Sequence, residues 1–261
     1  MTMFERLQKP FLTVETGEAY QPIRLAYDIR DMDKLTKMLS AMQCLESKGK
    51  QSWHWFWRNE CDDIHFESLE SFKRTQEKPI RLGTLLIKDD KLYINLPSFK
   101  RACLATPFFH RNLTMRAIKP GKADFLNKVF GLSERLPHGF SELFEDEVLD
   151  RIVHQRVEDY EAVQKRCEEA SSAEEAFNIL SEYTKNESKK SLPYAERYSF
   201  FDFDDNSTDP DVLYLGFYIF LRSRELVAIR RWFGESGYTL QDAAEDTIEK
   251  VFGGMDIDII E

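Results

Sequence analysis

The segment from Ser52 to Glu67, SWHWFWRNECDDIHFE, restricts the fold of this chain more than any other part of the sequence. Three of the four tryptophans, Trp53, Trp55 and Trp57, occupy alternate positions in it. Because successive side chains of a β-strand point to opposite faces, a strand here places the three indoles on one face of a sheet. We interpret this face as part of the hydrophobic core, with a stacking platform for a ligand as the alternative.

The same segment is predicted to form a β-hairpin. Residues 53–58 and 63–67 are the expected strands, and residues 59–62 are the expected loop. In this arrangement Ile64 and Phe66 join the tryptophan face.

The opposite face of the predicted hairpin carries titratable side chains. The pairing sets Arg58 opposite Asp63 and His54 opposite Glu67, with His65 on the same face. Two histidines and two carboxylates are the donor types of a divalent metal site, so the candidate ligands are His54, Asp63, His65 and Glu67. A solvated face with ion pairs between the strands is the alternative interpretation.

The composition is typical of a folded protein of the cytoplasm. Of the 261 residues, 42% are hydrophobic and 13% are aromatic, which argues against intrinsic disorder. The N-terminal residues show no apolar run of the kind found in a signal peptide. The longest uncharged apolar stretch, residues 212–221, is about half of what a bilayer span requires, so no membrane segment is expected.

The sequence contains no motif that identifies a family. Its four cysteines form no C-x-x-C pair and lack the spacing of a zinc site, so we expect reduced thiols. Cys61, near His65, is a candidate for a reactive thiol. The glycine-rich nucleotide-binding motifs, G-x-S-x-G and H-E-x-x-H are all missing.

Residues 20–118 alternate between strand and helix patterns, which predicts the α+β class. Further strands are expected at residues 22–29, 80–87 and 91–96, the last two joined by a tight turn at residues 88–90. Asp31 and Ser98 are expected to cap helices, the second of which should stop near Pro107. This order favours a mixed or antiparallel sheet with helices on one side.

The C-terminal half begins with a predicted acidic helical hairpin. Apolar residues recur at steps of three and four from Leu149 to Cys167, which indicates an amphipathic helix introduced by Ser141. Ser172 and Glu175 have the spacing of a capping box for a second helix, and residues 185–190 are expected to form the loop that closes the pair.

The last third is predicted to return to strands at residues 197–203 and 212–221, with a helix from Pro210 as the rival of the second strand. Helices are expected over residues 225–233, ending at Gly234, and over residues 240–252, capped by Thr239. We therefore divide the chain into a sheet-containing portion, 1–137, and a helical and mixed portion, 138–261. The final strands could instead return to the first sheet and make one continuous domain.

Charge is unevenly distributed along this chain, whose formal net charge is −10. Residues 97–128 contain seven Lys and Arg and one acid, whereas residues 133–187 contain 15 Asp and Glu and six Lys and Arg. The two segments either pack against each other or form solvated faces, or the basic segment binds an anion. The candidate anion-binding residues are Arg58, Lys100, Arg101, Arg111 and Arg116. Nucleic acid is possible as a ligand but is disfavoured by the net charge.

The absence of catalytic motifs favours a non-catalytic, cytoplasmic interaction or regulatory protein that acts through protein–protein contacts and needs no cofactor. The alternative is a metal-dependent hydrolase or phosphoryl-group enzyme that uses a divalent metal ion. A further alternative is local binding of an anion or a nucleic acid by residues 97–128.

Overall fold

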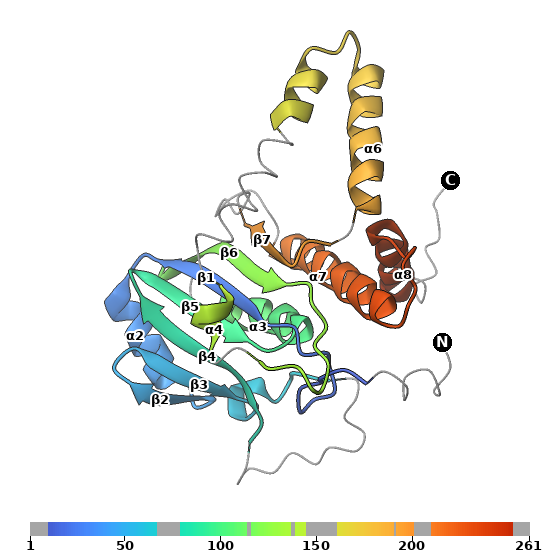
Figure 1. Ribbon diagram of the computed structural model, residues 1–261. Helices are drawn as coiled ribbons and strands as arrows, with labels where there is room; N and C mark the ends of the chain where they lie inside the picture. The colour runs from blue at the N-terminus through green and yellow to red at the C-terminus, as the bar shows by residue number, and fades with distance from the viewer. Residues whose placement is uncertain are drawn as a thin grey trace.

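The computed structural model describes residues 10–66, 79–113, 116–136, 139–144, 161–190, 192–200 and 210–252. Seven antiparallel strands form one sheet with the order β2-β3-β4-β5-β1-β6-β7 (Figure 1). Helices α2, α3 and α7 pack on one face, and the short α4 lies on the other (Figure 1). The prediction of the α+β class is confirmed, and the sheet is antiparallel rather than mixed.

The strands are β1 (Ile23–Ile29), β2 (Leu45–Gly49), β3 (Ser52–Phe56), β4 (Arg81–Lys88), β5 (Lys91–Leu96), β6 (Ile118–Leu126) and β7 (Ala195–Ser199). The helices are α2 (Met32–Ala41), the 3-10 helix η1 (Asn59–Cys61), α3 (Phe99–Asn112), α4 (Phe140–Leu143), α6 (Ala173–Lys189), α7 (Pro210–Trp232) and α8 (Leu240–Phe252). Residues 161–168 are also helical. None of the helices within the described ranges is both long and apolar enough to cross a bilayer.

The core lies between the sheet and helices α2, α3 and α7. The three tryptophans of the predicted tryptophan face, at positions 53, 55 and 57, are all buried in it, as are Ile64 and Phe66. The ring of Trp55 lies 5.2 Å from Phe108 and 5.0 Å from Phe109 of α3, measured between centroids. The prediction of a buried tryptophan face is confirmed.

The predicted hairpin around Asn59 is wrong. β3 does not pair with residues 63–66, the described part of the expected second strand; it lies between β2 and β4, so that His54 stands opposite Glu46 and Thr84. The chain continues from β3 into η1 instead of folding back. The Glu60 carboxylate accepts hydrogen bonds from the backbone N–H groups of Gln43 and Cys44, both at 2.8 Å, which ties η1 to the start of β2.

This tie should make the stability of the protein depend on Glu60 and on pH. Burial raises the pKa of Glu60, but the hydrogen bonds from Gln43, Cys44 and its own backbone outweigh it, so that the pKa is lowered. Glu60→Gln should lower the free energy of unfolding by about 1–2 kcal/mol at neutral pH, measured by urea unfolding. A lowered folded-state pKa gives stability above the ordinary glutamate pKa of about 4.3, and this stability is lost at lower pH. A difference between the two proteins that stays constant down to pH ~3 would contradict this account of the hydrogen bonds.

The open face of the sheet, opposite α2, α3 and α7, carries a line of polar residues that crosses all the strands. The strand register places one such residue directly opposite the next from edge to edge: Glu46, His54, Thr84, Asn95, Arg24, Asp124 and Arg197. Near one end of this line, Arg197 Nε donates to Asp124 Oδ1 at 2.5 Å. Near its middle, Arg24 Nε donates to Asn95 Oδ1 at 2.8 Å. The open face thus carries a line of ordered polar groups, of which Asn95 and Asp124 are buried.

Packing against the core explains why two further predictions are wrong, the end of one helix and the strand at residues 212–221. α3 does not stop near Pro107 but continues to Asn112, because Phe108 and Phe109 are buried in the core and their burial offsets the missing N–H. Residues 212–221 are not a strand. The rival prediction of a helix from Pro210 is correct, and α7 buries Phe217 and Leu221 against the core.

The acidic helical hairpin is present within the described residues. Residues 161–168 run beside α6, and Cys167 Sγ donates to the carbonyl of Ala176. The Ser172 hydroxyl caps α6 as predicted, accepting from Glu175 N at 3.1 Å. Ser141 does not introduce the first helix, because it lies inside α4, whose N-cap is Gly139. The loop expected at residues 185–190 is wrong, since α6 continues to Lys189.

The C-terminal portion contributes to the same sheet as the N-terminal portion. β7 pairs with β6, and α7 packs against α3. The boundary proposed at residue 137 falls outside the described residues, so the division into 1–137 and 138–261 stays a prediction.

Candidate functional site

A groove of about 950 Å³ lies where α6 meets α7 and α8. Its α6 wall carries Phe177 and Leu180, its floor includes Phe220 of α7, and Leu240 and Ala244 of α8 form the other side. In Figure 1, α6 projects from the body of the protein above α7 and α8, so that this groove lies at the foot of the projection.

The α6 wall of the groove is unusually apolar for a solvent-facing surface. Phe177 is 69% exposed and Leu180 is 44% exposed. None of the side chains described on α6 is buried. A contiguous exposed apolar surface of this kind marks interaction sites more often than isolated apolar residues do.

The sequence explains why these residues share one face of α6. Phe177, Leu180 and Thr184 follow each other at steps of three and four, which places them along one side of a helix, with Tyr183 beside them. Ser172 fixes the start of the helix through its hydroxyl. The apolar stripe of α6 therefore faces the groove that it shares with α7 and α8, and Phe177 and Leu180 remain exposed there.

A buried ion pair holds the floor of the groove. Arg224 of α7 donates through Nε to Glu196 Oε2 at 2.8 Å and through a terminal nitrogen to Glu196 Oε1 at 3.2 Å. Its guanidinium also lies over the ring of Phe220, 3.4 Å from the centroid. Glu196 is buried on β7 and also accepts from Asn127 Nδ2 at 2.6 Å. These bonds fix α7 to the sheet, so the floor is a rigid surface.

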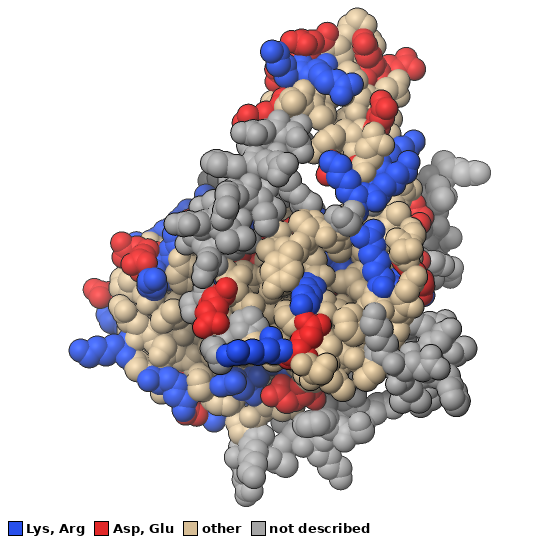
Figure 2. Space-filling view, viewed as in Figure 1, with Lys and Arg blue, Asp and Glu red and all other residues tan. Residues whose placement is uncertain are grey.

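The two ends of α6 differ in net charge, although Glu182 and Glu187 lie among the lysines of the C-terminal half. Glu174 and Glu175 lie in its first turn, whereas Lys185 and Lys189 lie toward its C-terminal end. Figure 2 shows Lys and Arg side chains gathered at the foot of α6, beside the surface of uncharged residues. The C-terminal end of α6, with Lys185, Lys189 and Lys190 against Glu182 and Glu187, therefore carries a net positive charge, and its first turn carries a net negative charge.

The four predicted metal ligands are not brought together by the pairing that was expected to join them. His54 lies on the open face of β3, while Asp63 and His65 are exposed in the segment after η1. Glu67 lies outside the described residues. The ranges that the structure describes contain no group of three or more His, Cys, Asp and Glu able to hold a metal ion. Burial, Arg81 and Lys48 lower the pKa of His54, which favours its neutral form.

The predicted anion-binding residues do not form one patch. Arg101 is only 1% exposed, whereas Arg111 and Arg116 are exposed at the end of α3 and before β6. Arg58, which follows β3, donates to the carbonyl of Gln43 at 3.0 Å, just before the start of β2. Lys100 borders a separate cavity between α3 and α7. The basic segment also forms ion pairs with residues outside the acidic hairpin: Arg101, for example, pairs with Glu15.

The structure places Cys61 in the core, away from solvent. Its sulfur accepts a hydrogen bond from Trp55 Nε1 at 3.0 Å. Cys61 also contacts Cys44, and the hydrogen bond between the Cys44 thiol and Cys61, in which the Cys44 thiol donates, together with burial raises the pKa of the Cys44 thiol. A reactive thiolate needs exposure to solvent, so this buried position does not fit the reactive cysteine considered from the sequence.

Comparison with models of protein families, with curated proteins and with solved structures found no match to this chain.

Sequence reasoning did not single out Phe177 or Leu180 as functional residues. Their spacing was visible within the predicted acidic helix, but apolar residues at that spacing usually face a core. What distinguishes them is their exposure, and this depends on how far α6 stands from α7 and α8.

Proposed function

We propose that this protein is a non-catalytic interaction protein that binds an amphipathic helix of a protein partner in the groove between α6, α7 and α8. The observation that carries the proposal is the exposure of Phe177 and Leu180 over an apolar groove with a fixed floor. Anchoring side chains of a partner would cover surface that α6 leaves in water.

The dimensions of the groove favour a helix as the occupant. The apolar wall of α6 runs from Phe177 to Thr184, which at 1.5 Å per residue is about 10 Å, or two helical turns. A helix laid along this wall would present side chains at positions i, i+4 and i+7, the pattern by which helices bind in grooves between other helices.

The charges beside the groove favour a partner of defined polarity. Lys185 and Lys189 border one end of α6, and Glu174 and Glu175 lie at the other. A partner helix with acidic residues at the lysine end would gain complementary charge, and the reverse orientation would bring like charges together. We therefore expect an amphipathic helix with an acidic flank at one end.

The hydrolase alternative and the anion-binding alternative of the basic segment gain no support from the described positions of their residues. His54 and His65 come from a β-strand and from an exposed segment that do not pair. The basic residues of segment 97–128 are dispersed, and Arg101 is buried.

Site-specific photo-crosslinking tests the proposed interaction. A benzophenone amino acid placed at Phe177 in cells that express the full chain should crosslink to a protein whose attached peptide has the pattern of an amphipathic helix with an acidic flank. The matched control is the same amino acid at Leu132, which is 63% exposed and does not line the groove.

Three results would overturn the proposal. They are no crosslink from position 177, the same crosslinked proteins from positions 177 and 132, and a crosslink from position 177 to a second copy of this chain. A crosslink to a protein meets only the first of two requirements for the proposal. A synthetic peptide of the crosslinked segment must also bind the purified protein, and failure of that peptide to bind counts against the proposal.

A further inference from the structure

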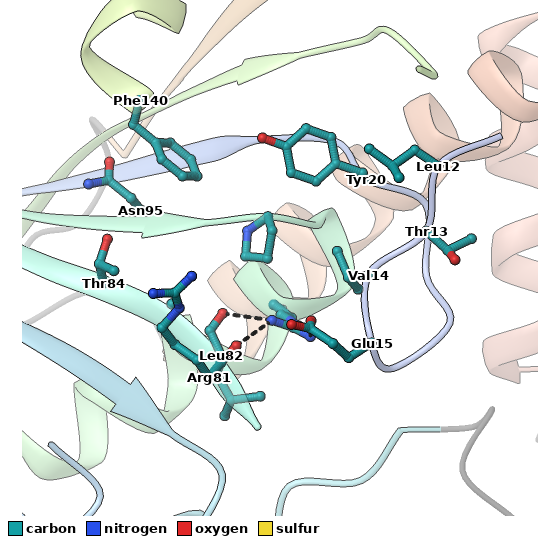
Figure 3. Close-up of a pocket in the computed structure, with 13 residues that line it drawn as sticks. Leu12, Thr13, Val14, Glu15, Tyr20, Arg81, Leu82, Thr84, Asn95 and Phe140 are labelled. Carbon is teal, nitrogen blue, oxygen red and sulfur yellow. Dashed lines mark hydrogen bonds and ion pairs between the residues drawn. The ribbon is translucent and has the colours of Figure 1, made fainter. Parts of the chain in front are cut away.

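A second cavity, of about 530 Å³, lies on the open face of the sheet, away from the groove (Figure 3). Four parts of the chain enclose it: the segment from Leu12 to Tyr20, strands β4 and β5 with the following Pro97, Arg101 of α3, and Phe140 of α4. We call it the open-face cavity. Its volume is within the range of pockets that bind small molecules.

The walls of the open-face cavity are held in place by Arg101. This buried side chain donates to the carbonyls of Arg81 and Leu82 at 2.8 and 3.2 Å, which fixes it to β4. It also donates to Thr16 Oγ1 at 2.9 Å and to Glu15 Oε2 at 3.2 Å, which fixes the N-terminal segment. The cavity is therefore already formed without a ligand, so little ordering remains to oppose binding.

Polar groups gather on one side of the open-face cavity. Figure 3 shows the Arg81 guanidinium and the Thr84 hydroxyl on the side formed by β4, with the Asn95 amide above them. The orientation of Asn95 is fixed by Arg24, whose Nε donates to Asn95 Oδ1 at 2.8 Å. Arg24 in turn lies 5.3 Å from the centroid of the Tyr93 ring.

Arg81 supplies an unbalanced positive charge at this cavity. Its side chain is exposed, and its guanidinium makes no hydrogen bond or ion pair with any residue in the described parts of the chain. The charge of Arg101, by contrast, is balanced by Glu15 and by Glu18. Among the residues that line the cavity, Arg81 and Arg101 are cationic and Glu15 is anionic, which leaves one net positive charge; Glu18, behind Arg101, lowers this charge further, so a monoanion suits the cavity better than a dianion.

Apolar and aromatic groups form the rest of the open-face cavity. The rings of Tyr20 and Phe140 lie along one side of it in Figure 3, and Leu12 and Val14 lie beyond Tyr20. The Tyr20 ring is held edge-on against Phe130, with centroids 5.5 Å apart. Burial raises the pKa of Tyr20, so its hydroxyl remains neutral at physiological pH.

We propose that the open-face cavity binds a small monocarboxylic acid with an aromatic or cyclic apolar body. The carboxylate pairs with the guanidinium of Arg81, the geometry that arginine forms most readily with this group. The apolar body lies against the rings of Tyr20 and Phe140. A phosphate monoester is a poorer match, because its second negative charge would face Glu15 without a second free cation to balance it.

Isothermal titration of three related compounds into the full chain tests this proposal. The probes are naphthaleneacetate, naphthaleneacetamide and naphthyl phosphate, which share a ring system and differ in the charged group. We expect the carboxylate to bind most tightly, and Arg81→Met to weaken its binding about tenfold or more. The Arg81 carbonyl that anchors Arg101 belongs to the backbone, so this substitution leaves the cavity walls in place.

The matched control is Arg116→Met, which removes an exposed arginine that does not line the cavity. The Arg116→Met variant should bind naphthaleneacetate with the same affinity as the wild type. The proposal is overturned if naphthaleneacetate does not bind, if Arg81→Met and Arg116→Met have equal effects, or if the amide or the phosphate binds as tightly as the carboxylate. These outcomes are independent of the groove, because neither arginine lines it.

Discussion

Trp55→Ala is expected to lower the free energy of unfolding by about 3–5 kcal/mol, measured by equilibrium unfolding in guanidinium chloride. Trp55 is 1% exposed and contacts the rings of Phe108 and Phe109 of α3. Its removal leaves a cavity between the sheet and α3 that these rigid aromatic neighbours cannot fill. It also leaves Cys61 without the hydrogen bond from the indole.

The neighbouring residue supplies the control for this prediction. His54 lies on the same strand but points to the open face, and it is partly exposed. His54→Ala should therefore cost less than about 1 kcal/mol. Equal losses for the two variants would contradict the assignment of the two faces of β3.

Arg101→Met is expected to lower the free energy of unfolding by about 3–5 kcal/mol. Burial lowers the pKa of the Arg101 guanidinium, and the carboxylates of Glu18 and Glu15 oppose this effect, so the group stays charged. Methionine matches much of the volume but donates no hydrogen bond. The variant would leave two backbone carbonyls of β4 without the donor that now offsets their desolvation, and the largely buried Glu18 without its neighbouring positive charge.

The same helix provides a matched control for Arg101. Arg111 is an exposed arginine on α3, and Arg111→Met should change the free energy of unfolding by less than about 0.5 kcal/mol. Unfolding of both variants in urea, followed by tryptophan fluorescence, gives the comparison. A loss for Arg101→Met no larger than that of Arg111→Met would show that the buried network does not hold the N-terminal segment to β4.

Local signals in the sequence predicted the starts of four helices and the buried face of β3. Asp31, Ser98, Ser172 and Thr239 were each expected to cap a helix, and each side chain accepts the expected backbone hydrogen bond. Caps depend on residues three positions apart, so distant parts of the chain have little influence on them. The side-chain alternation that buries Trp53, Trp55 and Trp57 is equally local.

Strand partners could not be predicted in the same way. β3 was expected to pair with residues 63–67, but its partners are β2, with the polar sequence LESKG, and β4, which follows many residues later. Alternation assigns a face to a side chain and carries no information about which strand lies beside it. For residues 212–221, aromatic and β-branched residues favoured a strand, and burial of Phe217 and Leu221 in a helix outweighed that preference.

Neither binding site proposed here has a contiguous signature. The open-face cavity joins Tyr20, Arg81, Thr84 and Phe140, which only the order of strands brings together. The exposure of Phe177 depends on the distance of α6 from α7 and α8. The candidate metal ligands were chosen from a local pairing that does not form, which is why the structure separates His54 from Asp63 and His65.

The affinity of the crosslinked partner segment for the groove tests the proposed function most directly. A synthetic peptide of that segment should bind the wild-type protein and the Leu132→Ser variant with equal dissociation constants. Phe177→Ser should weaken binding about tenfold or more, or about 1.4 kcal/mol, because it removes the exposed aromatic side chain of the apolar wall. Equal dissociation constants for Phe177→Ser and the wild type would contradict the assignment of the groove as the binding surface.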